Sequence, residues 1–226
     1  AMTSKVYGVR FNRAGTRIAT GHENKTAQVF AINDANAEAP LFSPVEHCVE
    51  NSVRQASPVF CDDDRKLVTV SGSKRQPVLR DATTGALLST DWKVPGDFER
   101  SLDISPNGQW IATGGNDNFV RVWSAADGSL VKELAGHPRH VYNVAFHPSG
   151  KALISGDLMG VIKQWDVDTW TMTRELDAKL LSKYDAGFKA DVGGIRAIDF
   201  SPDGKTLAVG GITDVSNAFA GIGNPL

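Results

Sequence analysis

Residues 101–137 read SLDISPNGQWIATGGNDNFVRVWSAADGSLVKELAGH, and residues 141–178 read VYNVAFHPSGKALISGDLMGVIKQWDVDTWTMTRELDA. The second stretch repeats the pattern of the first. Pro106 is matched by Pro148 and Trp123 by Trp165, a constant offset of 42 residues. Self-similarity at a fixed period indicates a repeat architecture in which each copy is one structural unit.

Each copy contains four short apolar runs separated by turn residues. Residues 120–123 and 161–165 alternate apolar and polar side chains, which is typical of a strand with one buried face. Proline and glycine in residues 105–108 and 147–150 indicate tight turns between antiparallel strands. A four-stranded sheet of this size cannot bury both faces alone, but stacking such sheets around an axis buries them. The sequence therefore predicts an all-β fold, a β-propeller built of four-stranded antiparallel blades.

The two copies resemble the repeats of the WD-repeat β-propeller family. The matching motifs are Gly-His at 136–137, the Pro-Asn-Gly and Pro-Ser-Gly turns, and Trp-Asp at 165–166. The resemblance implies a buried hydrogen-bonded tetrad of His, Ser or Thr, Asp and Trp in each blade. The residues that fit it are Thr113, Asp117 and Trp123 in one blade and His137, Ser155 and Trp165 in the next, where Met159 occupies the place of the Asp.

Weaker copies of the pattern extend over the whole chain, which we interpret as one propeller region, 1–226. The expected blades cover approximately 5–47, 52–92, 98–137, 139–178 and 194–226, the last one incomplete. Members of the family usually have seven or more blades, so we expect part of a larger propeller, an incomplete ring. A five-bladed ring with irregular closure is the alternative.

Residues 179–193 form an insertion between two blades. Leu180, Leu181 and Tyr184 have nearly helical spacing, which predicts a short amphipathic turn lying on the propeller. Two interpretations remain open, a functional insertion and a packed cover.

The composition excludes several classes of protein. The chain has 24 Lys and Arg against 26 Asp and Glu, so bulk charge favours neither nucleic acid nor membrane as a partner. Cys48 and Cys61 are expected to be small buried residues rather than a disulfide. No apolar run approaches the length of a membrane span, and no signal peptide is visible, which favours a cytoplasmic location.

No motif predicts catalysis, a cofactor or a metal site. A Ser-His-Asp set can be assembled from Ser155, His137 and Asp117, but the repeat already gives these residues a structural role. His137 and His147 are expected at opposite ends of a blade, too far apart to share a metal with His140. The acidic turn 62–64 is expected to be solvated rather than a cation site.

The resemblance also implies a binding face, because WD-repeat proteins commonly bind partners on the narrower face around the central opening. Its side chains come from the start of each first strand and from the turn beside the tetrad Asp. Aromatic and basic residues dominate this set, and both types are frequent in interface hot spots. The predicted partner-binding residues are Lys5, Tyr7, Arg54, Phe98, Arg100, Asn116, His140, Tyr142, Leu158 and Arg196.

The sequence therefore predicts a scaffold for protein–protein interaction that binds a peptide or protein on the propeller face, without catalysis. Arginine clusters bind carboxylate and phosphate groups, so we expect an acidic or phosphorylated partner. We also expect self-association through open blade edges. The alternative function is a recognition or regulatory propeller of a larger multidomain enzyme or sensor.

Overall fold

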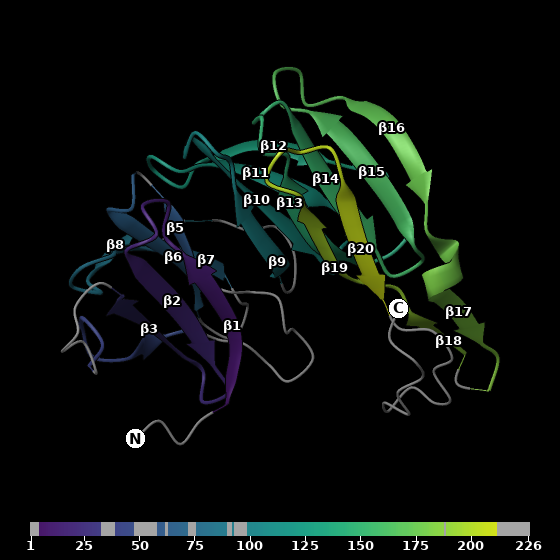
Figure 1. Ribbon diagram of the computed structural model, residues 1–226. Helices are drawn as coiled ribbons and strands as arrows, with labels where there is room; N and C mark the ends of the chain where they lie inside the picture. The colour runs from purple at the N-terminus through teal and green to yellow at the C-terminus, as the bar shows by residue number, and fades with distance from the viewer. Residues whose placement is uncertain are drawn as a thin grey trace.

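The protein is an arc of small antiparallel sheets (Figure 1). The structure, a computed structural model, describes residues 5–32, 39–47, 58–61, 63–71, 76–89, 92, 99–187 and 189–211. Apart from one 3₁₀ turn, these residues form strands and their connections, and no helix among them is long and apolar enough to cross a membrane. The predicted all-β class is confirmed.

Four sheets have four strands each, and in each sheet the strands lie in chain order. Blade 1 consists of β1 (Val6–Phe11), β2 (Arg17–His22), β3 (Thr26–Ala31) and β4 (Val45–Glu46). Blade 2 consists of β5 (Val59–Cys61), β6 (Lys66–Ser71), β7 (Gln76–Asp81) and β8 (Leu87–Ser89). Blade 3 consists of β9 (Glu99–Ile104), β10 (Trp110–Gly115), β11 (Val120–Ser124) and β12 (Leu130–Leu134). Blade 4 consists of β13 (Val141–Phe146), β14 (Ala152–Asp157), β15 (Val161–Asp166) and β16 (Met172–Asp177).

A fifth unit, blade 5, is described only by its first two strands, β19 (Ile195–Phe200) and β20 (Leu207–Gly211). Between blades 4 and 5 lie the 3₁₀ turn η1 (Lys179–Leu181) and a hairpin of β17 (Ser182–Asp185) and β18 (Ala190–Gly193). The helical spacing predicted for this insertion is therefore wrong beyond Leu181, because Tyr184 lies in a strand. Leu181 and Val192 are buried, whereas Leu180 and Tyr184 are exposed, so the insertion, η1 together with the hairpin, both packs against the blades and presents large hydrophobic side chains to solvent.

The first strand of each blade packs against the blade that precedes it. Phe60, the middle residue of β5, lies in a core cluster with Ala19 and Val29 of blade 1 and is 5% exposed. Phe146 of β13 packs in the same way against blade 3. Phe11 has the equivalent place in β1 but is 68% exposed, so the corresponding face of blade 1 is uncovered.

Side chains join neighbouring inner strands that share no β-ladder. Ser101 Oγ accepts the backbone N–H of Val144 at 3.0 Å, and Asp103 Oδ2 accepts that of Phe146 at 2.7 Å. Burial raises the pKa of Asp103, and the nearby Arg10 and the N–H of Phe146 oppose this effect. In the next pair of blades, Asn143 Nδ2 donates to Ile195 O at 3.0 Å. These bonds occupy backbone groups at the inner edge that would otherwise be free.

The acidic turn of blade 2 differs from the solvated turn that the sequence predicts. Asp64 is buried, and its carboxylate accepts hydrogen bonds from Asn12 Nδ2 at 2.9 Å and from the backbone N–H groups of Arg13 at 2.9 Å and Ala14 at 3.1 Å. Only Asp63, of the described residues in this turn, is exposed to solvent in the expected way. The hydrogen bonds of Asp64 thus connect the first turn of blade 1 to blade 2.

Candidate functional site

A β-bulge occurs near the start of the first strand in four blades. In β1, Val6 is opposite His22 and Gly8 is opposite Gly21, so Tyr7 is an extra residue in the strand pair. The same irregularity makes one residue extra in each of three other inner strands: Arg100 in β9, Tyr142 in β13 and Arg196 in β19. Bulges redirect a side chain relative to the sheet and occur frequently beside functional sites. We call these four positions the bulge row, and the end of the blades on which they lie the bulge face.

Three members of the bulge row stack on one another. The guanidinium carbon of Arg100 lies 4.5 Å from the ring centre of Tyr142, and that of Arg196 lies at the same distance of 4.5 Å. Arg100 belongs to the blade before Tyr142 and Arg196 to the blade after it, so the stack joins three consecutive blades. Cation–π contacts of this length are attractive. The structure therefore brings together three of the predicted partner-binding residues in one half-buried cluster.

Two further predicted residues lie beside this stack. Asn116, in the turn after β10, accepts a hydrogen bond from Arg100 Nε through its side-chain oxygen. His140 directly precedes β13, and its Nδ1 is buried with no hydrogen-bond partner among the described residues. Arg196 Nε is likewise buried without a partner in the described part of the chain. Buried polar atoms normally have partners, so these two nitrogens mark a place where the described residues leave hydrogen-bonding capacity unused.

The remaining predicted partner-binding residues are not part of the stack. Lys5 makes an exposed ion pair with Glu23, with 3.4 Å between Nζ and Oε1. Leu158 is buried and its backbone lies against Gly194, where a Cβ would overlap it, so this side chain belongs to the packing between blade 4 and blade 5. Tyr7 is placed only by its backbone, and Arg54 and Phe98 lie outside the described residues.

Blade 4 contains a complete buried tetrad. His137 Nε2 lies 2.7 Å from Ser155 Oγ, and His137 Nδ1 lies 3.1 Å from Asp157 Oδ2. Trp165 Nε1 donates to Ser155 Oγ at 2.8 Å. The placement of Met159 at the Asp position is therefore wrong: Asp157 holds it, and its other oxygen accepts the N–H groups of Met159 and Val161, each at 2.9 Å. Counting back from the tryptophan missed Asp157 because this residue lies two positions before Met159, at the end of β14, where blade 3 has Gly115. The Ser-Gly-Asp sequence at the end of β14 was the available signal.

Blade 3 has a shorter version of this network. Trp123 Nε1 donates to Thr113 Oγ1 at 3.0 Å. Asp117 does not face a histidine here; its carboxylate pairs with the buried guanidinium of Arg121. In blade 1, His22 occupies the position equivalent to Asp157, and its Nε2 lies 2.8 Å from Thr20 Oγ1. Burial lowers the pKa of His22.

The tetrad is not arranged as an active site. Ser155, His137 and Asp157 form a Ser-His-Asp chain, but Ser155 and Asp157 have no exposed surface, so a substrate could not reach the hydroxyl. His147, the third member of the histidine set, instead bonds to Gly204 O at 2.9 Å and to Ser149 Oγ at 2.7 Å. In the described part of the chain, no group of three or more His, Cys, Asp or Glu side chains is placed to hold a metal ion.

The fold and the buried hydrogen-bond networks place this chain in one class of repeat protein. In this class each repeat is a four-stranded blade, stabilised here by hydrogen bonds from Trp to Ser or Thr. Residues 96–124, 128–166 and 183–214 match the family described as WD domain, G-beta repeat. The chain belongs to the WD-repeat family.

Similar proteins carry these repeats within longer chains. Transcription initiation factor TFIID subunit 5 of Caenorhabditis elegans is 31% identical over 158 residues, which cover 66% of this chain and 21% of that protein. Nuclear distribution protein PAC1 of Mycosarcoma maydis is 37% identical over 79 residues, covering 35% and 17%. WD repeat and SOCS box-containing protein 1 of Takifugu rubripes is 34% identical over 94 residues, covering 41% and 22%. The chain thus spans about a fifth of the length of these relatives.

Proposed function

We propose that this chain is a non-catalytic scaffold that binds a protein or peptide partner on the bulge face. The observation that carries the proposal is the stack of Arg100, Tyr142 and Arg196, which three consecutive blades contribute through equivalent bulges. Tyrosine and arginine bury a large area and still form hydrogen bonds, which makes them frequent anchors of interfaces. The bulge row concentrates both types on one face.

The cationic character of the stack supports a partner segment that is acidic or phosphorylated. Such a segment would pair with guanidinium groups that Tyr142 already orients, so little side-chain freedom would be lost on binding. The names of the similar proteins fit a scaffold, since they describe a transcription initiation factor subunit and a nuclear distribution protein. A cytoplasmic location stays a prediction.

The second candidate is a recognition propeller within a larger multidomain enzyme or sensor. The observation that favours it is the small share of each relative that the chain covers, 17–22%. Both candidates use the bulge face in the same way and differ only in what accompanies it.

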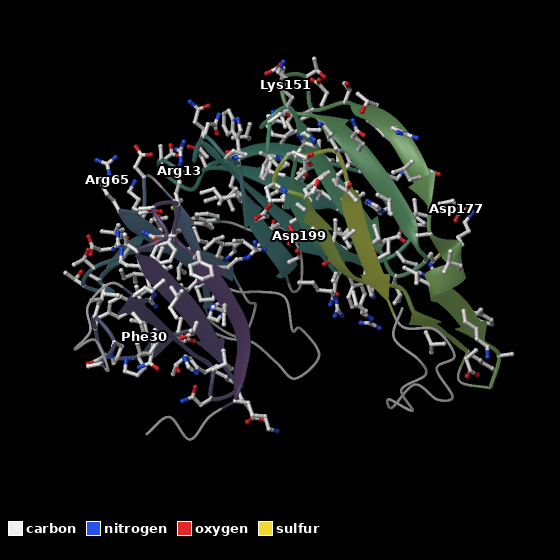
Figure 2. All side chains as sticks on the ribbon, viewed as in Figure 1. Arg13, Phe30, Arg65, Lys151, Asp177 and Asp199 are labelled. Atoms are coloured by element: carbon white, nitrogen blue, oxygen red, sulfur yellow. The ribbon has the colours of Figure 1, made fainter. Side chains whose placement is uncertain are left out.

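The test is quantitative affinity capture from a cell extract with the wild-type chain and single variants. Arg100→Glu and Tyr142→Ala should each remove the same set of captured proteins. Lys151→Glu is the control, because Lys151 is exposed in the turn after β13, at the opposite end of blade 4 (Figure 2). Far-UV circular dichroism shows whether each variant is folded. If folded Arg100→Glu and Tyr142→Ala capture the same proteins as wild type, the proposal is wrong.

A further inference from the structure

We propose that the insertion between blades 4 and 5 is a docking site, at which a segment of a partner protein adds a third strand to the hairpin of β17 and β18. The segment pairs with the outer edge of β17 and alternates apolar and acidic residues. This inference goes beyond the proposed function, because it concerns backbone pairing and uses none of the residues in the stack.

The hairpin is a sheet of two strands, of four residues each, that forms no ladder with any other described strand. A sheet of two strands is marginally stable unless it gains a third strand or packs against another element. The base of this hairpin does pack, because Leu181 lies in a core cluster with Ile162 and Ile195, and Val192 is buried. Beyond this base the hairpin projects past the end of β16 (Figure 1). The hairpin is therefore held in place while the outer edge of β17 has no described partner strand.

The backbone of Tyr184 faces this open edge. Gly194 N–H donates to Leu181 O at 2.6 Å, and the residue pairs of the hairpin continue from there in register. Hydrogen-bonded and non-hydrogen-bonded pairs alternate along an antiparallel ladder, so Lys183 and Asp185 direct their backbone groups to β18. The N–H and C=O of Tyr184 point the other way, where an added strand can bond to both.

The side chains of β17 give its two faces different chemistry. Lys183 lies opposite Val192 and two residues after Leu181, so it shares the face of these two buried residues. Tyr184 lies on the other face and is 61% exposed. Lys183 is also exposed, and neither of the two forms a hydrogen bond or ion pair with a described residue. One face of β17 thus offers a cation and the other an aromatic ring.

These two side chains determine what the added strand carries. Opposite charges, and pairs of an aromatic with a β-branched residue, are favourable between neighbouring antiparallel strands. An acidic residue beside Lys183 and a valine or isoleucine beside Tyr184 meet both conditions. The two fall on successive positions of one strand, because successive side chains point to opposite faces. Leu180 in η1, which is 72% exposed, adds apolar surface directly before β17.

The test is binding of the synthetic peptide acetyl-Val-Glu-Val-Glu-Val-Glu-amide to the 226-residue chain, monitored by ¹H–¹⁵N NMR. We expect hydrogen exchange of the Tyr184 backbone N–H to slow in the complex, because this group gains an acceptor. A peptide with Lys in place of Glu should bind at least about threefold more weakly, since its charge opposes that of Lys183.

Two substitutions at one position separate the backbone from the side chain. Tyr184→Pro removes the outward N–H, and an edge strand tolerates proline where its nitrogen faces solvent. Tyr184→Val also removes the ring but keeps the N–H. Tyr184→Pro should therefore weaken binding of the Glu peptide at least about threefold more than Tyr184→Val does, the value of one hydrogen bond.

A charge exchange gives an independent measurement. Lys183→Glu should weaken binding of the Glu peptide by about threefold to tenfold and strengthen binding of the Lys peptide by a similar factor. Lys205→Glu is the matched control, because Lys205 is an exposed lysine in the turn between β19 and β20. It should leave binding of both peptides within about twofold of wild type.

The inference is overturned if neither peptide binds, if both bind equally well, or if Lys183→Glu leaves the preference unchanged. It is also overturned if Tyr142→Ala weakens binding as much as Tyr184→Pro, because the peptide would then lie on the bulge face. Slow exchange of the Tyr184 N–H in a dimer of the chain without peptide would assign the edge to a second copy and would refute the proposal as well.

Discussion

Replacing Ser155 by Ala should reveal how much the blade 4 tetrad contributes to stability. Asp157 is an acceptor, so His137 donates from Nδ1 to Asp157, and its Nε2 accepts the hydroxyl proton of Ser155. The same hydroxyl oxygen accepts from Trp165 Nε1. Ser155→Ala therefore leaves two buried groups without partners, His137 Nε2 and Trp165 Nε1.

Each buried unsatisfied group costs about 1–3 kcal/mol, so Ser155→Ala should lower the free energy of unfolding by about 2–5 kcal/mol. The free energy of unfolding of a folded domain is typically about 5–15 kcal/mol, so a loss of this size can decide whether the variant stays folded. The matched change is Thr113→Val in blade 3, which keeps the side-chain shape and leaves only Trp123 Nε1 unpaired. It should cost about 1–3 kcal/mol.

The assay is urea unfolding followed by tryptophan fluorescence and by far-UV circular dichroism. Trp165→Phe provides a further check, because it removes Trp165 Nε1, one of the two groups that Ser155→Ala leaves unpaired. In that background the cost of Ser155→Ala should fall by about 1–3 kcal/mol. The reasoning is refuted if Ser155→Ala costs no more than Thr113→Val, or if its cost is the same in both backgrounds.

Three other predictions follow from the fold. Asp64→Ala should lower the free energy of unfolding by about 2–4 kcal/mol in urea titrations, because the donors from Asn12, Arg13 and Ala14 lose their acceptor. Asp63→Ala, in the same turn but exposed, should cost less than about 0.5 kcal/mol, and equal effects of the two variants would contradict the structural role of Asp64. Gly128→Ala should lower the melting temperature markedly, because Gly128 has a φ of 79° and a Cβ there would overlap Trp92. Gly15→Ala, at a φ of 68° with open space around it, measures the cost of the backbone conformation alone, and an equal fall in melting temperature would show that Trp92 does not contact Gly128. Burial lowers the pKa of His22, so as the pH falls below about 6.5 the unfolded chain binds a proton more readily than the folded chain, and stability decreases. His22→Gln should lose this part of the pH dependence of the free energy of unfolding between about pH 7.5 and 5, and an unchanged dependence would show that His22 has the same pKa in both states.

The repeated stretch was enough to predict the fold class because it carries its own evidence: the strand alternation and the turn residues recur together at one spacing. The tetrad was harder to predict. Trp123 and Trp165 are equivalent, and counting residues from them led to Met159. The carboxylate that bonds to His137 is instead that of Asp157, at the end of β14, where blade 3 has Gly115. Asp64 was missed because its main partner, Asn12, is 52 residues away, and local composition carries no information about such a contact.

The bulge row was predictable only in part. Alignment of the blades brought Arg100, Tyr142 and Arg196 into one row, but not into contact. Their stacking depends on bulges, which arise from the register of each strand pair and have no fixed composition. The unused nitrogens of His140 and Arg196 are also properties of packing that a linear sequence does not display.

The bulges have a consequence for how this protein can change over generations. A residue that is extra to the strand pair is not held to the alternation of inward and outward side chains that constrains its neighbours. Substitutions at Tyr7, Arg100, Tyr142 and Arg196 therefore alter the chemistry of one surface while the ladders beneath it keep their register. Under the proposed function, specificity can therefore be changed by substituting one residue per blade, and these four positions are where a library of designed variants should be built.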